Sequence, residues 1–532
     1  MIKTKVAISI LSLVLIFILG CSAHPGKNSE VNISKKNESS NYAQLNNLTL
    51  AILVDDLTYS GVTSEITQFI EDIHKDTHFS VQIKVFPSDI KKEIIKEYLK
   101  GIYFNNNLEA AIFIGDIPTA YYFPGTVTQE KIPTDTYYYD VYDKCLFNEQ
   151  NQAFESKNKF CNPIVLPFVI SRITSPIKGS SGVKLIKNYL DNNHAFRTGT
   201  ISFDQKAVIY PQTFNSIEGD ENEQATLENV VGNFQRFYAI NSLPMYDKDS
   251  ILIADWKNTV GNPEPNKNFL QELSNGHQYI FVDAHGYPQG HLYNIDKNNL
   301  QNPNAFYIDF YSCNVGKFTE NDYIAGYYLL KGRSMFVKAS SDFLFKPIGV
   351  VESQKLFLLK QGQPILETIK SQEEPSFIIQ YFGDPTLKMQ QGIKQKNSKA
   401  KIHLDKDQID FGEIKVCKNI LSYNSCKDKS AIKKISFGIS NQGEDTLGFY
   451  VSSLPDYSLE TIQNSMPPGD WFTPYKISFD SLSYSVGPNQ KDSFTINMLG
   501  IVKGDYTGKI WMYNSDPKNP LIKIPFRVKV TD

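Results

Sequence analysis

Short apolar runs alternate with amphipathic segments in the first part of the chain. Residues 48–54 (LTLAILV), 80–85 and 110–114 (AAIFI) are rich in residues that favour strands. Helical patterns over 64–74 and 89–103 separate these runs. Strands and helices alternating at this spacing predict βαβ units and a mostly parallel sheet.

The same alternation continues to about residue 390. Further strands are predicted over 164–170, 207–210, 279–284, 305–311 and 334–339, and further helices over 183–196, 227–240, 322–330 and 352–360. The segment 133–143 is too aromatic and acidic for a linker, and Gly383-Asp384-Pro385 marks the last turn. We therefore predict an α/β domain over 47–390, with a first subdomain over 47–200 and a second over 201–390.

The pattern changes after a polar, lysine-rich stretch at 391–400, which is typical of a linker. Beyond it the helical period disappears, and short alternating runs are separated by turn residues. These runs predict strands over 409–416, 432–440, 448–452, 492–498, 505–514 and 521–530. Such spacing favours an immunoglobulin-like β-sandwich over 401–532, with Trp471 and Trp511 as candidate core anchors.

The N-terminus has the composition of an export signal. Lys3 and Lys5 precede an apolar run over 6–19, which is shorter than the roughly 20 residues that a membrane-spanning helix needs. Residues 18–21 (ILGC) resemble the bacterial lipobox, which would make 1–20 a signal peptide and Cys21 the lipidated first residue of the mature chain. Residues 21–46 would then be a polar tether. The alternative is an ordinary signal peptide with an incidental cysteine.

Composition narrows the function classes. The chain has 532 residues, of which 41% are hydrophobic, so it can bury substantial cores. Its formal net charge of -3 argues against a partner held mainly by phosphate contacts, and we expect no nucleic-acid partner.

The cysteine positions predict two disulfides and one remaining thiol. In an oxidising compartment, Cys145 with Cys161 and Cys417 with Cys426 are natural local pairs, because each brackets a short polar segment. Cys313 is left over and becomes a candidate reactive thiol. The sequence contains no CxxC motif and no cysteine and histidine cluster at zinc spacing, so we expect no metal site.

Two of the predicted strands end in reactive side chains. The run over 279–284 ends at His285-Gly286, and the run over 305–311 ends at Ser312-Cys313. The carboxyl ends of neighbouring parallel strands meet at one edge of a sheet, so a thiol would lie beside an imidazole as nucleophile and base. The alternatives are that Cys313 is a small buried apolar residue, that His285 is a core histidine, or that His291 serves as the base.

Several stretches together resemble the gingipain-type cysteine peptidases, which share the caspase-like fold. They occur in order over roughly residues 48–390: Phe113-Ile114-Gly115-Asp116, Ile117-Pro118, Thr134-Asp135-Thr136-Tyr137-Tyr138, Ser171-Arg172, Ala284-His285-Gly286, Tyr311-Ser312-Cys313-Asn314 and Phe382-Gly383-Asp384-Pro385. The C-terminal segment resembles the bacterial immunoglobulin-like modules of the ASH type.

The resemblance implies thiol peptidase chemistry. Cys313 would be the nucleophile, His285 the general base, and the backbone amides of Gly286 and Cys313 the oxyanion hole. Independently of family, a glycine after the histidine allows close approach of the backbone to the substrate carbonyl.

Family members that cleave after basic residues carry acids in the loop that corresponds to 212–224. Rough matching puts Gln212 or Thr213 near the position of a third catalytic acid, and it puts Glu223 or Gln224 near the specificity position. The acidic set over 218–224 comprises Glu218, Asp220, Glu221 and Glu223, and together with Gln224 it forms the candidate specificity loop. Asp116 and Asp135 are weaker candidates for catalytic acids, because an aspartate at a strand end more often caps a helix or a turn.

We therefore predict an envelope-anchored cysteine endopeptidase that acts on a protein or peptide, contacts the membrane through lipidated Cys21 and needs no cofactor. Structural calcium has no supporting motif. Two alternatives stay open, namely a catalytically silent lipoprotein that binds a partner, and a transpeptidase or sorting enzyme with the same dyad. The oligomeric state also stays open.

Overall fold

The computed structural model describes residues 48–123, 130–141, 143, 147–148, 153–155, 166–211, 251–253, 265–291, 294–342, 359, 362–372, 377–389, 399–417, 429–454, 475–479, 483–500, 503–514, 516 and 521–532. The predicted export signal and tether, the acidic loop over 212–224 and the predicted helix over 227–240 lie outside these residues. So do Cys145, Cys161, Cys426 and Trp471. No helix among the described residues is long and apolar enough to cross a membrane.

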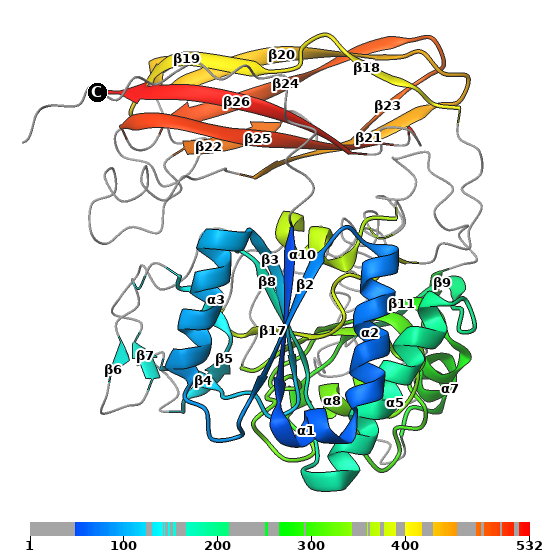
Figure 1. Ribbon diagram of the computed structural model, residues 1–532. Coiled ribbons are helices and arrows are strands. Elements are labelled where there is room, and N and C mark those ends of the chain that lie inside the picture. Colours follow the sequence, from blue (N-terminus) through cyan, green and yellow to red (C-terminus); the bar gives the residue numbers. More distant parts are fainter. Residues whose placement is uncertain are drawn as a thin grey trace, which may run out of the picture. The chain divides into compact units, whose positions relative to one another are not determined.

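A ten-stranded sheet forms the centre of the first domain (Figure 1). Its strand order is β10-β9-β11-β15-β16-β17-β8-β3-β1-β2. The strands are β1 Thr49–Asp55, β2 Ser80–Phe86, β3 Leu108–Ile114, β8 Val169–Ile173, β9 Asp204–Pro211, β10 Ile251–Ile253, β11 His277–Asp283, β15 Ala305–Tyr311, β16 Phe336–Ser340 and β17 Ile379–Gly383.

The sheet consists of two parallel halves that run in opposite directions. β10, β9, β11, β15 and β16 are parallel to one another, and so are β17, β8, β3, β1 and β2. The halves join where β17 pairs antiparallel with β16, from Phe336↔Gly383 to Ser340↔Ile379. The predicted mostly parallel sheet is confirmed, and the antiparallel junction is a new feature.

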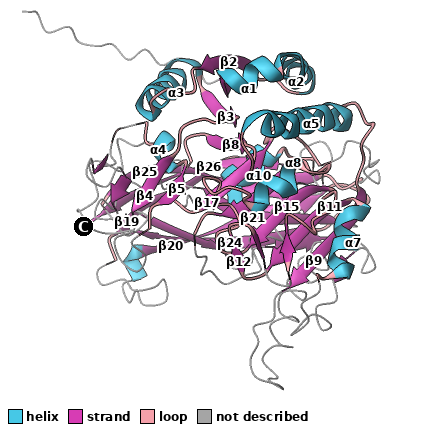
Figure 2. Ribbon diagram, turned by 90° about the horizontal axis from the view of Figure 1, so that it is seen from below, coloured by secondary structure: helices cyan, strands magenta, loops and turns pink. Residues whose placement is uncertain are grey.

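Helices cover both faces of the sheet. Figure 1 shows α3 on one side of β1 to β3, with α2 and α5 on the other, and Figure 2 shows α7 beside β9 and β11. α2 and α5 are tied by hydrogen bonds from His194 Nδ1 to Asp72 at 2.7 Å and from Arg197 to Asp76 at 3.0 Å. The helices are α1 Asp56–Gly61, α2 Thr63–Asp76, α3 Lys92–Asn106, α4 Thr136–Tyr139, α5 Gly179–Arg197, α7 Lys267–Asn275, α8 Ile324–Leu330 and α10 Ile365–Gln372.

Two small sheets accompany the large one. The first has the order β5-β4-β7-β6, with β4 Ala120–Phe123, β5 Ile132–Thr134, β6 Phe147–Asn148 and β7 Ala153–Glu155. The second follows β11 directly and has the order β12-β13-β14, with β12 Gly286–Tyr287, β13 Gly290–His291 and β14 Ile295–Asp296. Sequence patterns did not predict either sheet, because strands of two to four residues are too short to show a period.

The C-terminal segment forms a sandwich of two sheets, drawn in yellow to red in Figure 1. One sheet has the order β18-β20-β24-β22, and the other has the order β19-β26-β25-β21-β23. The bounds are β18 Ile402–Leu404, β19 Ile409–Lys415, β20 Ile432–Asn441, β21 Leu447–Leu454, β22 Tyr475–Phe479, β23 Ser483–Val486, β24 Lys491–Gly500, β25 Gly504–Asn514 and β26 Leu521–Thr531, with a 3-10 turn at Lys429–Ala431.

The sandwich has its own hydrophobic core, separate from that of the α/β domain. Alternating residues of β26, including Ile524, Phe526 and Val528, are buried in it. This alternation is what made all six predicted strands recognisable, and all six are confirmed, with three shorter strands in addition. The chain thus combines an α/β domain with a β domain.

Candidate active site

The two candidate catalytic residues follow strands that pair in register. β11 and β15 are parallel, with Phe281 opposite Asp309 and Asp283 opposite Tyr311. Most of their side chains are fully buried, and burial fixes the register because a slip would expose apolar groups. His285 and Cys313 each stand two residues beyond the last of these pairs. The register therefore brings the two residues to equivalent positions on neighbouring strand ends.

Gly286 lies directly against the loop that carries Cys313. A Cβ atom at residue 286 would fall 2.5 Å from Cγ1 of Val315 and closer still to the carbonyl oxygen of Cys313. Only a residue without a side chain fits this approach. The glycine after the histidine is thus explained by contact between the two site loops, whereas the sequence suggested contact with a substrate.

The Cys313 loop is fastened to the end of β16. Asn314 has φ of 60°, a left-handed conformation that asparagine adopts more readily than most residues. Its amide donates to the carbonyl of Asp342 at 3.2 Å, and the amide of Gly316 donates to the carbonyl of Ser340 at 2.7 Å. The turn after the cysteine is therefore held by backbone hydrogen bonds to a neighbouring strand.

Cys313 carries a thiol and is half-buried, while His285 is exposed. Cys417, by contrast, is disulfide-bonded. The prediction that Cys313 is a thiol is therefore confirmed. Both residues are therefore at least partly exposed to solvent.

His291, the alternative base, lies in the core. It is fully buried, and its Nε2 lies 2.8 Å from the hydroxyl of Tyr328. The rings of Phe269 and Phe310 pack around it at centroid distances of 5.9 Å. A histidine enclosed in this way packs the domain, so His285 is the better candidate base.

A buried ion pair supports the cysteine loop from the other half of the sheet. Arg172, with 1% of its side chain exposed, donates from Nη2 to Asp135 Oδ1 at 2.6 Å and from Nε to Oδ2 at 2.9 Å. Its guanidinium lies 5.1 Å from the ring of Phe113 and 4.3 Å from the ring of Phe318, which follows Cys313 by five residues. Burial is the largest single cause and would lower the pKa of Arg172, but the charge and the hydrogen bonds of Asp135, with smaller contributions from Tyr138 and Tyr323, together raise that pKa.

This ion pair settles the role of one weaker candidate acid. The Asp135 carboxylate is engaged by Arg172, so it stabilises the fold rather than orienting His285. The other candidate, Asp116, has an exposed side chain that pairs with Lys178. The hydroxyl of Tyr138, from the aromatic segment over 133–143, donates to the carbonyl of Pro118 at 2.6 Å. Asp135 and Tyr138 therefore serve the packing of the domain.

A second buried charge pair lies on the strand that leads to Cys313. Asp309 of β15 is 3.3 Å from the amino group of Lys338 on β16, and it accepts a hydrogen bond of 3.0 Å from Tyr279 on β11. Sequence patterns missed this cluster, because a charged residue inside an apolar strand gives no sign of its partner. The cluster ties three adjacent strands together just below the strand ends.

The segments that follow His285 and Cys313 are also fastened to each other. The amide of Ile324, at the start of α8, donates to the carbonyl of Pro288 at 2.7 Å. Lys297 forms an ion pair with Asp322. The hydrogen bonds from Lys297 and Tyr327 lower the pKa of Asp322. Three kinds of contact therefore fix the distance between the two halves of the site, namely strand pairing, Gly286 and this clamp.

Comparisons with known proteins give distant structural likenesses. No family model matches the chain, and no curated protein matches it. Among solved structures, the complex of Porphyromonas gingivalis RgpB pro- and mature domains is similar with a TM-score of 0.41 and 12% identity, covering 91% of this chain and 100% of that one. A human ASH/PapD-like domain is similar with a TM-score of 0.19 and 12% identity, covering 27% and 95%.

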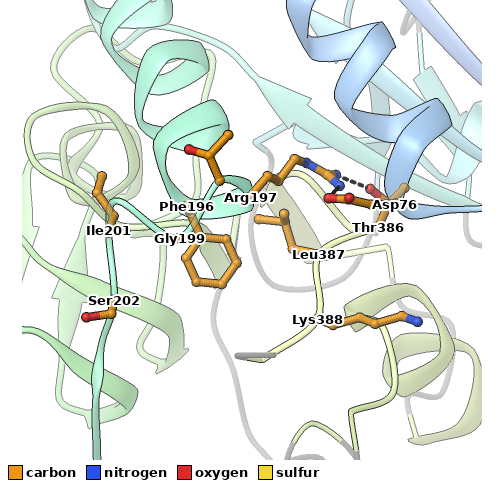
Figure 3. A pocket seen from close by; sticks show the side chains of 10 residues that line it. Asp76, Phe196, Arg197, Gly199, Ile201, Ser202, Thr386, Leu387 and Lys388 are labelled. Carbon is orange, nitrogen blue, oxygen red and sulfur yellow. Dashed lines mark hydrogen bonds and ion pairs between the residues drawn. The ribbon is translucent and has the colours of Figure 1, made fainter. Parts of the chain in front are cut away.

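A cavity of about 300 Å³ lies elsewhere in the domain, where α5 ends (Figure 3). Its lining includes Arg197, Asp76 and Thr386, and it includes neither His285 nor Cys313. Arg197 donates to Asp384 Oδ2 and to Thr386 Oγ1, both at 2.6 Å. Asp384 also accepts from the amide of Thr386 at 2.9 Å, so its predicted role in stabilising the last turn is confirmed.

The described residues contain no group of three or more histidine, cysteine and acidic side chains that could hold a metal ion. The acidic set over 218–224, with Gln212 and Thr213, lies outside the described residues. The specificity position and a third catalytic acid therefore stay predictions.

Proposed function

We propose that this protein is a cysteine endopeptidase in which Cys313 is the nucleophile and His285 the general base and acid. One observation carries the proposal: paired strands in fixed register end in a half-buried thiol and an exposed imidazole, and Gly286 packs directly on the Cys313 loop. A nucleophile with a base on the neighbouring strand end is the minimum that acyl transfer requires.

The reaction runs in two balanced steps. His285 takes the thiol proton, and the Cys313 sulfur attacks the peptide carbonyl carbon, whose C=O electron pair moves to the oxygen. The tetrahedral intermediate collapses to a thioester as the C–N bond breaks, and His285 gives its proton to the leaving nitrogen. Water then attacks the thioester with His285 as base, and the products are a carboxylic acid and the restored thiol.

We assign the oxyanion hole to the backbone amides of Gly286 and Cys313. The close packing of Gly286 on the Cys313 loop supports this pairing, because two donors must converge on one oxygen. We assign recognition of a basic residue before the scissile bond to the acidic set over 218–224. Lipidated Cys21 and the tether over 21–46 would hold the enzyme at the cell envelope, with exported proteins as substrates.

The test labels the purified protein with acyloxymethyl ketones that vary in the residue presented to the nucleophile. Wild type should be labelled at Cys313 and should cleave members of a peptide library, and Cys313→Ala should do neither. His285→Ala should lose about 10²- to 10⁴-fold in cleavage rate, the range for removing a general base.

The matched control is His403→Ala, because His403 is also exposed but lies on β18 of the sandwich. It should leave the cleavage rate unchanged. A wild-type protein that is neither labelled by any probe nor able to cleave any peptide would show that the domain is catalytically silent.

A further inference from the structure

The hairpin that follows His285 presents an aromatic ring at its edge. β12 pairs only with β13 in the order β12-β13-β14, so Tyr287 stands on the edge strand two residues beyond His285. Tyr287 is 42% exposed. The other well-exposed large apolar side chains of the described residues lie on α1, β2 and α3: Leu57, Ile83, Ile94 and Phe104. Tyr287 is therefore the exposed aromatic residue that adjoins the candidate site.

The ring of Tyr287 packs against Gly290. Tyr287 is opposite Gly290, which is opposite Asp296, so the three residues form one row across the hairpin. A Cβ atom at residue 290 would fall 2.6 Å from the Tyr287 hydroxyl oxygen and 2.8 Å from Cζ. The missing side chain of Gly290 thus lets the phenol lie across β13. Burial, with the charge of Asp296 as a smaller cause, raises the pKa of Tyr287, so the ring stays neutral.

The position of this hairpin relative to the nucleophile is fixed. Pro288, the neighbour of Tyr287, accepts the hydrogen bond from Ile324, and Lys297 is paired with Asp322. Both partners lie on the segment that follows Cys313. The ring is therefore anchored to the cysteine side of the site as well as to His285, and it can serve as a rigid surface for a substrate.

The chemistry decides which part of a substrate meets this ring. His285 protonates the leaving nitrogen, so the departing half of the peptide must lie on the His285 side of Cys313. We propose that Tyr287 is a specificity-determining residue that contacts the side chain immediately after the scissile bond and selects large apolar or aromatic ones. The exposed ring supplies the apolar surface, and the Asp296 carboxylate in the same row disfavours an acidic residue. This inference rests on the proposed function.

The test compares peptides that share one acyl half and differ only in the residue after the scissile bond: Phe, Leu, Gly, Gln or Glu. In wild type, kcat/KM should be highest for Phe and Leu, and it should be lower for Glu than for Gln. Tyr287→Ala should lower kcat/KM for the Phe and Leu peptides by about tenfold, the change expected for losing roughly 1.4 kcal/mol of contact. It should leave the Gly peptide unchanged, and Tyr287→Phe should keep the wild-type ranking.

Two measurements separate the inference from the proposed function. A peptidyl chloromethyl ketone, whose leaving group is only chloride, occupies the acyl side alone, so Tyr287→Ala should be labelled by it at the wild-type rate, which also shows that the variant is folded. Phe104→Ala, which removes another exposed aromatic side chain on α3, should have no effect on the ranking.

Suppose that the wild-type protein is labelled and active. If Tyr287→Ala then lowers kcat/KM by the same factor for all peptides, or for none of them, the inference alone is overturned. A wild-type protein that is neither labelled nor active would overturn the proposed function and this inference with it.

Discussion

Two polar regions of the α/β domain differ in how their charged and reactive groups are used. At the cavity where α5 ends, Arg197 is bonded to Asp76, Asp384 and Thr386, and its guanidinium is nearly enclosed. At the ends of β11 and β15, His285 is exposed and the thiol of Cys313 is half-buried. In the first region, Arg197 is paired with two carboxylates beside the cavity. The second has accessible chemistry held in place by the backbone.

The cavity and the proposed catalytic pair therefore lie in different parts of the domain. A buried arginine bonded to carboxylates stabilises the joint between α2, α5 and the turn after β17, because removing either charge leaves the other without compensation. A catalytic pair instead needs reactive atoms that meet solvent and substrate while their supports stay rigid. A substitution at one region should therefore leave the other region unaffected.

The largest effect is expected at the cavity. Arg197→Met should lower the free energy of unfolding by about 3–5 kcal/mol, because it leaves the fully buried Asp384 carboxylate without its cation. Urea unfolding measures this loss. Folded Arg197→Met protein should still label at Cys313 at the wild-type rate. Slower labelling per folded molecule would show that the cavity and the strand ends are coupled, contrary to the comparison.

The next effect is expected at the strand ends. Gly286→Ala should lower kcat/KM by about 100-fold, because the new methyl group forces the His285 and Cys313 loops apart by a fraction of an ångström or more. Peptide cleavage kinetics measure it. Gly101→Ala on α3 is the matched control, since a Cβ there would meet nothing within 4 Å. Equal activities of the two variants would show that the close approach of Gly286 is unimportant.

A smaller effect is expected at the buried ion pair between Arg172 and Asp135. Arg172→Lys keeps the charge opposite Asp135 but loses the second bond of the fork and the flat contact with Phe318, so it should cost about 1–3 kcal/mol of stability. The labelling rate of Cys313 should also fall, because Phe318 belongs to the cysteine loop. Denaturant unfolding and labelling kinetics give the two values. A stability loss with unchanged labelling would make Arg172 purely structural.

The smallest effect concerns pH. The pKa of Asp322 in the folded protein lies below its ordinary value of 3.8, so the Lys297 clamp contributes fully above that pH and is lost as pH falls through the lowered value. The clamp is worth about 0–1 kcal/mol, because solvent screens it. Asp322→Asn should therefore lose less stability than wild type as pH falls below the ordinary pKa of 3.8. If the urea midpoints of wild type and Asp322→Asn fall in parallel as pH is lowered, the Lys297–Asp322 ion pair does not stabilise the protein.

The sequence predicted the elements whose signals are local. Continuous apolar runs identified β1, β3, β11 and β15, because strands buried on both faces keep few polar residues. The alternating pattern identified the long strands of the sandwich. β17 was missed, since its five residues IQYFG contain a buried glutamine and follow no period. The opposite direction of the two half-sheets is equally invisible in a sequence, because strand direction depends on long-range pairing.

For the candidate site, the sequence pointed to His285 and Cys313 but not to the residues that support them. His285 and Cys313 were found because each follows a recognisable strand. The partnership of Arg172 with Asp135 spans 37 residues, and that of Lys338 with Asp309 joins two strands, so neither has a local signature. The packing of Tyr287 on Gly290 could have been suspected, because a glycine inside a strand often marks a place where another group approaches the backbone closely.

β17 has a consequence for how the chain reaches its native state. It is the last strand of the large sheet in sequence, yet it lies between β16 and β8 and joins the two halves. During synthesis, each half can assemble its own parallel strands while two sheet edges wait for residues 379–383. Unpaired edges are templates for association with other chains. A nascent chain of this protein is therefore most vulnerable to aggregation in the interval before its final α/β strand emerges from the ribosome.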